Sequence, residues 1–348
     1  MPTISTKKTL RRKPSITLEQ ALARYCVEVS IKKRNPDSDV SLARTWCATP
    51  LAQRPLASIL SSDLIRLRDK WLMHLRPATV VRRLALVSHL YTVARKDWGM
   101  HELANPVQLV RRPAVDDGRT RRLFERIKLR GVSVQECPPS ELQWLINATR
   151  SAELPIIMIM AAETCMRRGE IAGIRRENID LVNGTVFLSM TKNGDSRYVP
   201  LTPVVRILLR NYLASMPARG RIFSMTPEAI TRAFIRARNR ARASYEALCG
   251  KYGRRPRDEY FADLRFHDLR HESTSRLAAT MEMHQLAKVT GHRDTRMLLR
   301  YFHPHGRELV RQINSSTLGK RQRQKLQQYR AEHGSDRDIS PATATSYR

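Results

Sequence analysis

The first hundred residues carry apolar side chains at the three- and four-residue spacing that is typical of amphipathic helices. Thr17 and Gln20 form a capping-box pair that predicts the start of a helix. A further helix is predicted over 61–75, and another begins at Pro77, because the first turn of a helix tolerates proline. The apolar face of that last helix consists of Val80, Leu84, Val87, Tyr91 and Ala94. We therefore predict a compact helical unit over 17–106.

The helical pattern is interrupted between residues 107 and 139. This stretch holds several prolines, a turn signal at Asp116-Asp117-Gly118 and a run of basic residues. We interpret 107–139 as a basic linker, in which 123–137 is an insertion of unknown use. Residues 1–16 form a basic N-terminal arm, and a second insertion is predicted at 249–262.

The second half of the chain combines helices with two short β segments. A helix is predicted over 153–164. The segments 182–188 and 197–201 are rich in β-branched residues and are associated with Asn-Gly pairs, which is typical of antiparallel hairpins. Thr202-Pro203 and Thr226-Pro227 then start two more helices. The pattern predicts a mainly α fold with a small antiparallel β-sheet.

The helix that follows Thr226-Pro227 has two different faces. One is an apolar stripe of Ile230, Phe234, Ala237, Ala241, Tyr245 and Leu248. Arg232, Arg236 and Arg240 recur every four residues on another face, and like charges at this spacing disfavour an isolated helix. A bound polyanion would offset that repulsion. The helix therefore either lies on a DNA groove or presents a solvated basic face.

The charge of the chain indicates a polyanionic partner. Its 348 residues include 63 Lys and Arg against 32 Asp and Glu, a formal net charge of +31. The basic residues are spread along the whole chain and interleaved with apolar positions, which favours a folded nucleic-acid-binding protein over a core with one basic tail. Charge alone does not separate DNA from RNA as the partner.

Cysteine usage and apolar runs indicate the compartment. The five cysteines are far apart and form no C-x-x-C pair, which is typical of reduced thiols in the cytosol. The longest apolar run, 156–162, is too short to cross a bilayer. Residues 1–15 lack the apolar region of a secretory signal. We expect a cytoplasmic protein with no membrane partner.

A set of polar residues in short, distinctive contexts indicates chemistry on a phosphodiester. The set consists of Arg167, Lys192, His267, Arg270, His292 and Tyr301. Guanidinium forks match two phosphate oxygens and stay protonated, tyrosine is a nucleophile, and lysine and histidine transfer protons. Glu170 lies one helical turn after Arg167 and could orient it. Such a set can attack a phosphodiester without a metal.

A metal site is the competing interpretation of the histidines. His267 and His271 are four residues apart, a spacing that zinc ligands can use. The chain lacks an H-E-x-x-H motif and cysteines at metal-binding spacing, so we predict no metal and a structural role for His271.

In order and spacing, these motifs resemble the tyrosine recombinase (phage integrase) family over residues 17 to about 305. The resemblance implies a two-domain DNA clamp, with a helical core-binding domain at 17–106, a DNA breaking-rejoining catalytic domain at 140–318 and a C-terminal helix and tail at 319–348. Two departures are mild. Cys165 replaces a usual glycine, and Phe302-His303-Pro304 replaces a common Thr-His.

The resemblance further implies site-specific recombination without a cofactor. Tyr301 would form a 3′-phosphotyrosyl link, and Lys192 would protonate the departing 5′-oxygen. The expected assembly is a homotetramer on two DNA sites that exchanges strands through a Holliday junction, with accessory DNA-bending proteins as possible partners. The C-terminal segment Leu309–Tyr329 would dock on a neighbouring protomer. Localisation would be cytoplasmic and nucleoid-associated. The expected DNA contacts are Arg82, Arg83, Arg119, Arg121, Arg122, Arg232, Arg236 and Arg240.

Three other classes compete with this interpretation. A type IB topoisomerase uses the same chemistry, but the N-terminal helical unit resembles the integrase type. A non-catalytic DNA-binding protein would not need the complete residue set. A metal-dependent transposase needs clustered carboxylates, and the sequence offers no such grouping. Site-specific recombination is therefore the function that we predict.

Overall fold

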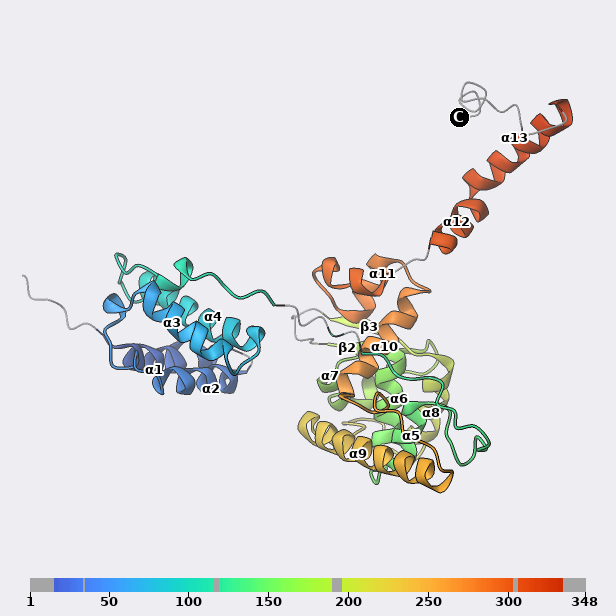
Figure 1. The fold of residues 1–348 in the computed structure, drawn as a ribbon, viewed down its shortest axis with the longest axis horizontal. Helices are drawn as coiled ribbons and strands as arrows, with labels where there is room; N and C mark the ends of the chain where they lie inside the picture. The colour runs from blue at the N-terminus through green and yellow to red at the C-terminus, as the bar shows by residue number, and fades with distance from the viewer. Residues whose placement is uncertain are drawn as a thin grey trace, which may run out of the picture. The chain divides into compact units, whose positions relative to one another are not determined.

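The structure is a computed structural model that describes residues 16–33, 35–115, 119, 121–189, 196–302 and 306–333. The chain divides into two compact units, Met1–Arg119 and Thr120–Arg348 (Figure 1). Most described residues are helical, and one small antiparallel sheet accompanies them, as the sequence predicted.

The first unit is a bundle of helices and 3-10 turns. In chain order these are α1 (Leu18–Glu28), η1 (Ser30–Lys32), α2 (Pro36–Cys47), η2 (Leu56–Ser58), α3 (Ser61–Leu72), α4 (Pro77–Lys96) and η3 (Pro106–Leu109). The predicted capping box is present, since the Thr17 side chain accepts from the Gln20 backbone and the Gln20 side chain accepts from the Thr17 backbone. Helix α2 was not predicted, although it begins with a favourable proline and carries acidic residues in its first turn.

Buried aromatic side chains fix the packing of the first unit. Trp46 of α2 is fully buried, and its indole N–H donates to the Arg83 carbonyl of α4 at 3.0 Å. Tyr91 of α4 is also fully buried and donates to the Leu56 carbonyl at 2.8 Å. These bonds satisfy polar groups that burial would otherwise leave unpaired, so both aromatic side chains are buried without losing a hydrogen-bond partner.

The segments that the sequence marked as linker and insertions take part in both hydrophobic cores. Val107 and Val110 are buried with the first unit. Leu123 and Ile127 are buried with the second unit, as is Phe261 from the predicted second insertion. The turn signal at 116–118 lies outside the described residues. Sequence pattern missed these contributions because isolated apolar residues without periodicity give no helix or strand signal.

The second unit begins with α5 (Glu141–Ala148), α6 (Leu154–Thr164), α7 (Arg168–Ala172) and the 3-10 turn η4 (Arg176–Asn178). The three described strands are β1 (Ile179–Asp180), β2 (Thr185–Leu188) and β3 (Arg197–Pro200), in the antiparallel order β1-β2-β3. Val186 pairs with Ile179 on one side and Val199 on the other. The chain continues through α8 (Pro203–Leu213), α9 (Pro227–Lys251), α10 (Phe266–Ala278) and α11 (Met283–Thr290).

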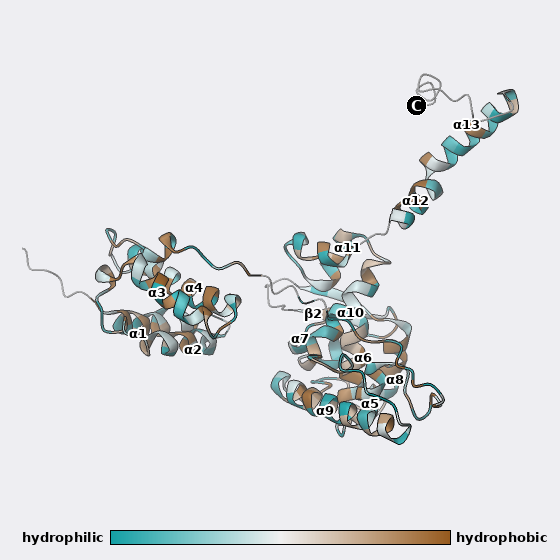
Figure 2. Cartoon of the chain, viewed as in Figure 1, coloured by the Kyte–Doolittle hydropathy of each residue, from teal (hydrophilic) through white to brown (hydrophobic). Residues whose placement is uncertain are grey.

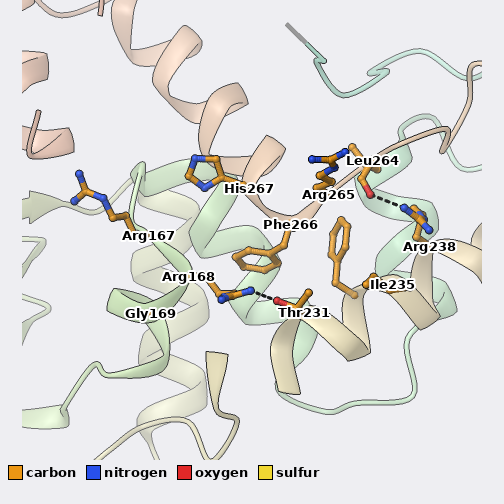
Figure 3. Close-up of a pocket in the computed structure, with 11 residues that line it drawn as sticks. Arg167, Arg168, Gly169, Thr231, Ile235, Arg238, Leu264, Arg265, Phe266 and His267 are labelled. Carbon is orange, nitrogen blue, oxygen red and sulfur yellow. Dashed lines mark hydrogen bonds between the residues drawn. The ribbon is translucent and has the colours of Figure 1, made fainter. Parts of the chain in front are cut away.

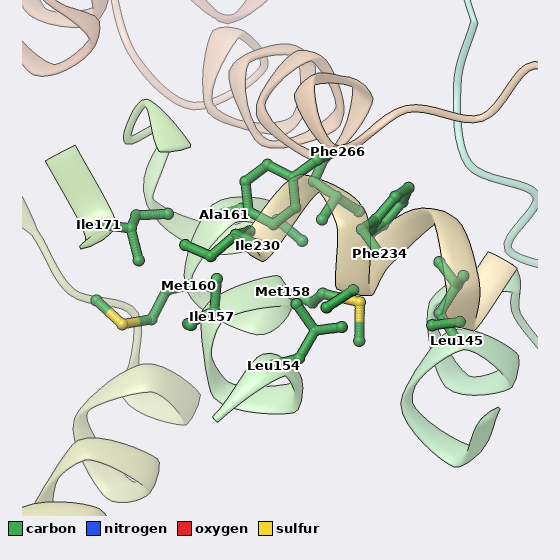
Figure 4. Packing of buried hydrophobic residues seen from close by; sticks show 14 of the residues in the cluster. Leu145, Leu154, Ile157, Met158, Met160, Ala161, Ile171, Ile230, Phe234 and Phe266 are labelled. Carbon is green, nitrogen blue, oxygen red and sulfur yellow. The ribbon is translucent and has the colours of Figure 1, made fainter. Parts of the chain in front are cut away.

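The core of the second unit lies where α6, α9 and α10 meet. Figure 4 shows Met158 and Ala161 of α6 close to Ile230 and Phe234 of α9, with Phe266 of α10 above them. Hydrophobic and hydrophilic residues alternate along α9 at helical spacing (Figure 2). The predicted apolar stripe of α9 is buried at every position except the half-buried Leu248. The arginine face of the same helix is consequently directed away from this core.

The segment that leads to Tyr301 consists of two 3-10 turns, η5 (Thr295–Met297) and η6 (Leu299–Tyr301), where a helix beginning near Asp294 was expected. The Asp294 side chain caps η5 by accepting from the Arg296 backbone at 3.0 Å. Beyond Tyr301 follow α12 (Gly306–Ser315) and α13 (Thr317–His333). Among the described residues, none of the helices combines the length and apolarity that a bilayer crossing requires.

Candidate active site

The turn before Arg167 holds its backbone in a defined conformation. Cys165 ends α6 with φ of 55°, in the left-handed region that glycine favours, which accounts for the family's usual glycine at this position. The cysteine is accommodated because its backbone N–H donates to Ser273 Oγ at 3.0 Å and its side chain is fully buried. The predicted departure therefore leaves the turn intact.

Arg167 is fixed by both neighbouring and distant groups. Its guanidinium donates to Glu170 Oε1 at 2.9 Å and to the Gly291 carbonyl at 3.1 Å. Glu170 Oε2 accepts from the Arg167 backbone N–H at 2.7 Å, which caps α7. The contact that the R-x-x-E spacing indicated is present, and the separate bond to the Gly291 carbonyl ties the guanidinium to the end of α11.

Arg197 of β3 was not singled out from the sequence. Its guanidinium donates to both carboxylate oxygens of Glu170, at 3.1 and 2.8 Å, and to the Val289 carbonyl at 2.9 Å. Burial alone would raise the pKa of Glu170, but the hydrogen bonds from Arg197 and Arg167 hold it below its ordinary value. A sequence signal existed, because Arg197 lies two residues before the buried Val199 and therefore shares the inward face of the strand with it.

Gly291 packs directly on the Arg197 guanidinium. This residue ends α11 with φ of 69°, and a Cβ added there would lie 3.0 Å from Arg197 Nη1. Glycine is therefore required twice, for the left-handed turn and for the close approach of the guanidinium. The arrangement delivers His292 into the site immediately after the turn.

Arg270 is almost completely buried, with 4% of its surface exposed. It donates to the Thr290 carbonyl at 2.7 Å and to the Cys165 carbonyl. Burial lowers the pKa of Arg270 to about 10, which still leaves it cationic at neutral pH. Both arginines thus donate to carbonyls of the turn before His292, and Arg270 also donates to a carbonyl of the turn before Arg167.

Tyr301 contacts His271, the histidine to which the sequence gave a structural role. The Tyr301 hydroxyl lies 2.5 Å from His271 Nδ1, across a separation of 30 residues. Burial lowers the pKa of His271 to about 4, so its ring is neutral at pH 7 and can accept the phenol proton. Burial also raises the pKa of Tyr301, against the opposing effect of Arg300, Arg270 and Arg122. The interpretation of His271 as merely structural is therefore revised.

His267 and His292 complete the described histidines of the site. The His267 ring lies edge-on to His271, with 4.8 Å between centroids, and burial lowers the pKa of His267. His292 Nδ1 lies 2.7 Å from Thr290 Oγ1. Burial lowers the pKa of His292 to about 4, with Arg270 and Arg167 adding to the effect. Both rings are neutral near pH 7 and can either donate or accept a hydrogen bond.

An open cleft runs from these residues along α9. Figure 3 shows Arg167 and His267 at one end and Arg238 and Arg265 at the other, with Phe266 between them. The Arg238 guanidinium donates to the Leu264 carbonyl at 3.0 Å. The cleft has an apolar floor and a cationic rim, which is the surface expected to hold a phosphodiester backbone.

Lys192 and the Asn193-Gly194 turn lie outside the described residues. The strands on either side of them, β2 and β3, are described and pair in antiparallel fashion. The other five predicted residues come from four segments, since His267 and Arg270 share α10, and they converge through the contacts given above.

The arginines that the sequence assigned to DNA fall into two groups. Arg82, Arg232 and Arg236 are exposed. Others are engaged within the protein: Arg83 lies 4.6 Å over the Trp71 ring, Arg121 pairs with the buried Glu141 at 2.5 Å, Arg122 lies over Tyr301, and Arg240 donates to the Ala148 carbonyl at 2.6 Å. Arg119 is described and also takes part in an interaction within the protein. The sequence could not distinguish the two groups because long-range partners leave no local signal.

Comparison with known proteins decides the family. The family model for the phage integrase family matches residues 137–307. The shufflon-specific DNA recombinase of Escherichia coli is 33% identical over 325 residues, which cover 89% of this chain and 74% of that protein. The chain belongs to the tyrosine recombinase (phage integrase) family. It is a site-specific tyrosine recombinase, and the family and activity predicted from the sequence are confirmed.

Solved structures of tyrosine recombinases share its fold. A Tn1549 transposon integrase in complex with a circular intermediate DNA superposes with a TM-score of 0.62 at 17% identity, covering 87% of this chain and 100% of that one. A lambda integrase tetramer bound to a Holliday junction gives a TM-score of 0.60 at 18% identity, covering 85% and 80%. At this identity the likeness establishes the fold class, which agrees with the sequence prediction.

Proposed function

We propose that this recombinase cleaves and rejoins DNA through a covalent bond between Tyr301 and the 3′-phosphate at the break. The observation that carries the proposal is that Arg167 and Arg270 both donate to carbonyls of the turn before His292, while the Tyr301 hydroxyl contacts His271 of the helix that carries Arg270. Two fixed cations and a nucleophile in contact with a base are the components that phosphoryl transfer requires.

The arginines have the task of holding the scissile phosphate. Arg167 is already fixed by the Glu170 carboxylate and the Gly291 carbonyl, and Arg270 by two carbonyls, so little reorganisation is needed when the phosphate gains charge in the transition state. His292 would donate a further hydrogen bond to a phosphate oxygen. Removing one preorganised donor of this kind typically costs about 3–4 kcal/mol of transition-state stabilisation.

The cleavage step breaks one bond to phosphorus and forms another. The Tyr301 oxygen attacks phosphorus, its proton passes to His271 Nδ1, and the bond from phosphorus to the 5′-oxygen breaks. Lys192 would supply the proton that the departing 5′-oxygen needs. Rejoining is the reverse, with a 5′-hydroxyl as nucleophile and Tyr301 as leaving group. The phosphodiester energy is conserved throughout, so ATP is not required.

DNA binding would bring the histidines closer to the pKa at which they can transfer protons. In the free protein the surrounding cations help to keep His271 and His292 neutral. A bound phosphate brings negative charge to the same place, which raises the pKa of a nearby imidazole. DNA binding would thereby move His271 towards the range in which a histidine accepts and returns a proton at neutral pH.

The DNA partner and the assembly extend the proposal to several copies of the chain. We propose that the protein binds double-stranded recombination sites as a homotetramer and exchanges strands through a Holliday junction, to integrate or excise a mobile element in the nucleoid. The lambda integrase tetramer bound to such a junction supports this by its shared fold. Exposed apolar residues of the C-terminal helices, Leu309, Val310, Ile313 and Leu318, support docking on a neighbouring protomer.

A covalent-trapping experiment tests the central step. The protein is mixed in EDTA with nicked suicide substrates that carry candidate sites, and a DNA-linked band is sought on a denaturing gel. We expect the band from the wild-type protein and from Tyr198→Phe, which changes a tyrosine that is 65% exposed, but not from Tyr301→Phe. A band that Tyr301→Phe leaves unchanged would refute the assignment of the nucleophile.

A further inference from the structure

Arg122 lies against the nucleophile, although it belongs to a segment that the sequence assigned to a linker. Its guanidinium carbon is 5.6 Å from the centroid of the Tyr301 ring. Its Nη1 is buried and finds no hydrogen-bond acceptor within the part of the chain that the structure describes. A buried cationic donor without an acceptor is unusual in a native protein and calls for an anion or a functional reason.

The backbone around Arg122 is anchored on both sides. Arg121 pairs with the buried Glu141 of α5 at 2.5 Å. The backbone N–H of Phe124 donates to the other Glu141 oxygen at 2.9 Å, and that of Leu123 donates to Glu272 of α10 at 3.4 Å. Two buried carboxylates therefore hold this segment against the catalytic unit. These anchors fix the backbone from which the Arg122 side chain reaches over the Tyr301 ring.

Tyr301 therefore lies between a proton acceptor and several cationic side chains. His271 faces its hydroxyl, Arg122 faces its ring, and Arg270 and Arg300 contribute positive charge from α10 and η6. Positive charge over a phenol stabilises the phenolate relative to the neutral form, and a cation over the ring face also restrains the ring.

We propose that Arg122 is a positioning residue for Tyr301: it holds the ring against His271 and stabilises the negative charge that the phenol oxygen develops as it attacks. This role rests on the proposed function of Tyr301 as nucleophile. It differs from that of Arg167 and Arg270, which hold the phosphate, and from that of Lys192, which protonates the leaving group. Arg122 therefore acts on the nucleophile and is not a general contact to the DNA backbone.

The test separates nucleophile activation from leaving-group protonation. Single-turnover cleavage is measured with the full-length protein on two substrates, one normal and one with sulfur in place of the bridging 5′-oxygen, since a thiolate leaves without needing a proton. We expect Arg122→Gln to cleave both substrates about 3- to 30-fold more slowly than the wild type. We expect sulfur to restore Lys192→Ala but not Arg122→Gln.

Two further readouts would not respond to a merely structural role. The defect of Arg122→Gln should shrink as pH rises, because hydroxide then removes the phenol proton that the cation no longer helps to release. Arg122→Lys, which keeps the charge, should recover part of the rate. Arg126→Gln, an exposed arginine of the same segment, is the matched control and should cleave at the wild-type rate.

The outcomes are distinguishable from failure of the proposed function. If the wild type is active and Arg122→Gln cleaves at the same rate, the role of Arg122 alone is overturned. The same holds if the sulfur substrate restores the cleavage rate of Arg122→Gln, or if the defect of this variant does not change with pH. If Arg122→Gln does not fold, Arg122→Lys decides by the same pH profile. A wild type that forms no adduct on any site overturns both the nucleophile assignment and this inference.

Discussion

Arg197 donates to both carboxylate oxygens of Glu170 across 27 residues of sequence, and the same carboxylate holds Arg167. The hairpin strand β3 is thereby joined to the turn that presents the first phosphate-binding arginine. Because Arg197 also binds the Val289 carbonyl and packs under Gly291, it links that turn to the one that presents His292. A side chain that touches no substrate in this scheme thus determines the spacing of those that do.

Arg197→Lys should weaken the site by removing this two-pronged contact. Both partners are more than nine-tenths buried, so breaking the pair leaves a poorly compensated carboxylate, at a cost of about 3–5 kcal/mol of folding stability if one partner is lost entirely. We expect lower stability in urea and slower DNA cleavage with DNA affinity largely kept. The exposed pair of Arg175 with Glu177 gives the control, and Arg175→Ala should cost far less stability, because solvent screens an exposed ion pair. Equal losses for both variants would contradict the argument.

His271→Asn should slow cleavage while leaving DNA binding intact. The hydroxyl of Tyr301 would lose the acceptor that lies 2.5 Å away, and a positioned base typically contributes about 10²- to 10⁴-fold. Single-turnover formation of the covalent adduct measures the effect, and His284→Asn, at a histidine whose side chain is 69% exposed, serves as control. Wild-type cleavage by His271→Asn would show that the phenol proton leaves by another route.

Folding stability should fall as pH drops below neutral. The pKa of His271 and of His292 is about 4 in the folded protein, against 6.5 in the unfolded chain, so only the unfolded chain takes up protons between these values. Above pH 6.5 both states are neutral and contribute nothing; from there down to about pH 4 stability is progressively lost. Glu170 has a depressed pKa and adds its own loss only at lower pH, as pH falls through its folded value.

Urea unfolding at pH 7 and pH 5 measures this dependence. We expect a loss of about 1 kcal/mol for each of the two imidazoles, reduced from the full linkage value because both are partly solvated. The double change of His271 and His292 to Asn should flatten the dependence, and His284→Asn should not. An unchanged slope in the double variant would contradict burial of the neutral rings.

The arginine face of α9 separates into two kinds of residue. Arg232 and Arg236 are exposed, whereas Arg240 donates to the carbonyl of Ala148 at the end of α5. Changing both Arg232 and Arg236 to Ala should lower DNA affinity and reduce the slope of log affinity against log salt by about two, one for each phosphate contact. Arg240→Ala should instead reduce stability by about 1–3 kcal/mol and leave the slope nearly unchanged. The reverse pattern would exclude α9 from the DNA interface.

Docking of the C-terminal helices predicts a defect in assembly. Leu309 and Ile313 lie one helical turn apart on α12 and are 44% and 55% exposed. Their joint replacement by Asp should prevent higher-order complexes on DNA, measured by light scattering, without unfolding the protein. The exposed polar residue Gln312 on the same helix provides the control as Gln312→Glu. Complexes of unchanged size in the double Asp variant would place the protomer contact elsewhere.

Local rules account for much of the fold. The Thr-Pro pairs before α8 and α9 begin these helices as predicted, because a capping hydroxyl and a fixed proline φ act within one turn. The hairpin around β2 and β3 likewise follows from β-branched residues. Helix α2 and the 3-10 turns before Tyr301 were missed, since short or weakly periodic segments take their conformation from what they pack against.

The sequence by itself determined which chemistry the protein carries, because residue types such as Arg167, Arg270 and Tyr301 stand in short contexts that can be recognised without a structure. Only the tertiary structure decided which groups support them: Arg197 under Gly291, His271 at the Tyr301 hydroxyl and Arg122 over its ring. These contacts join residues far apart in the chain. They depend on how α7, α10, β3 and the segment before α5 pack together, which no local spacing records.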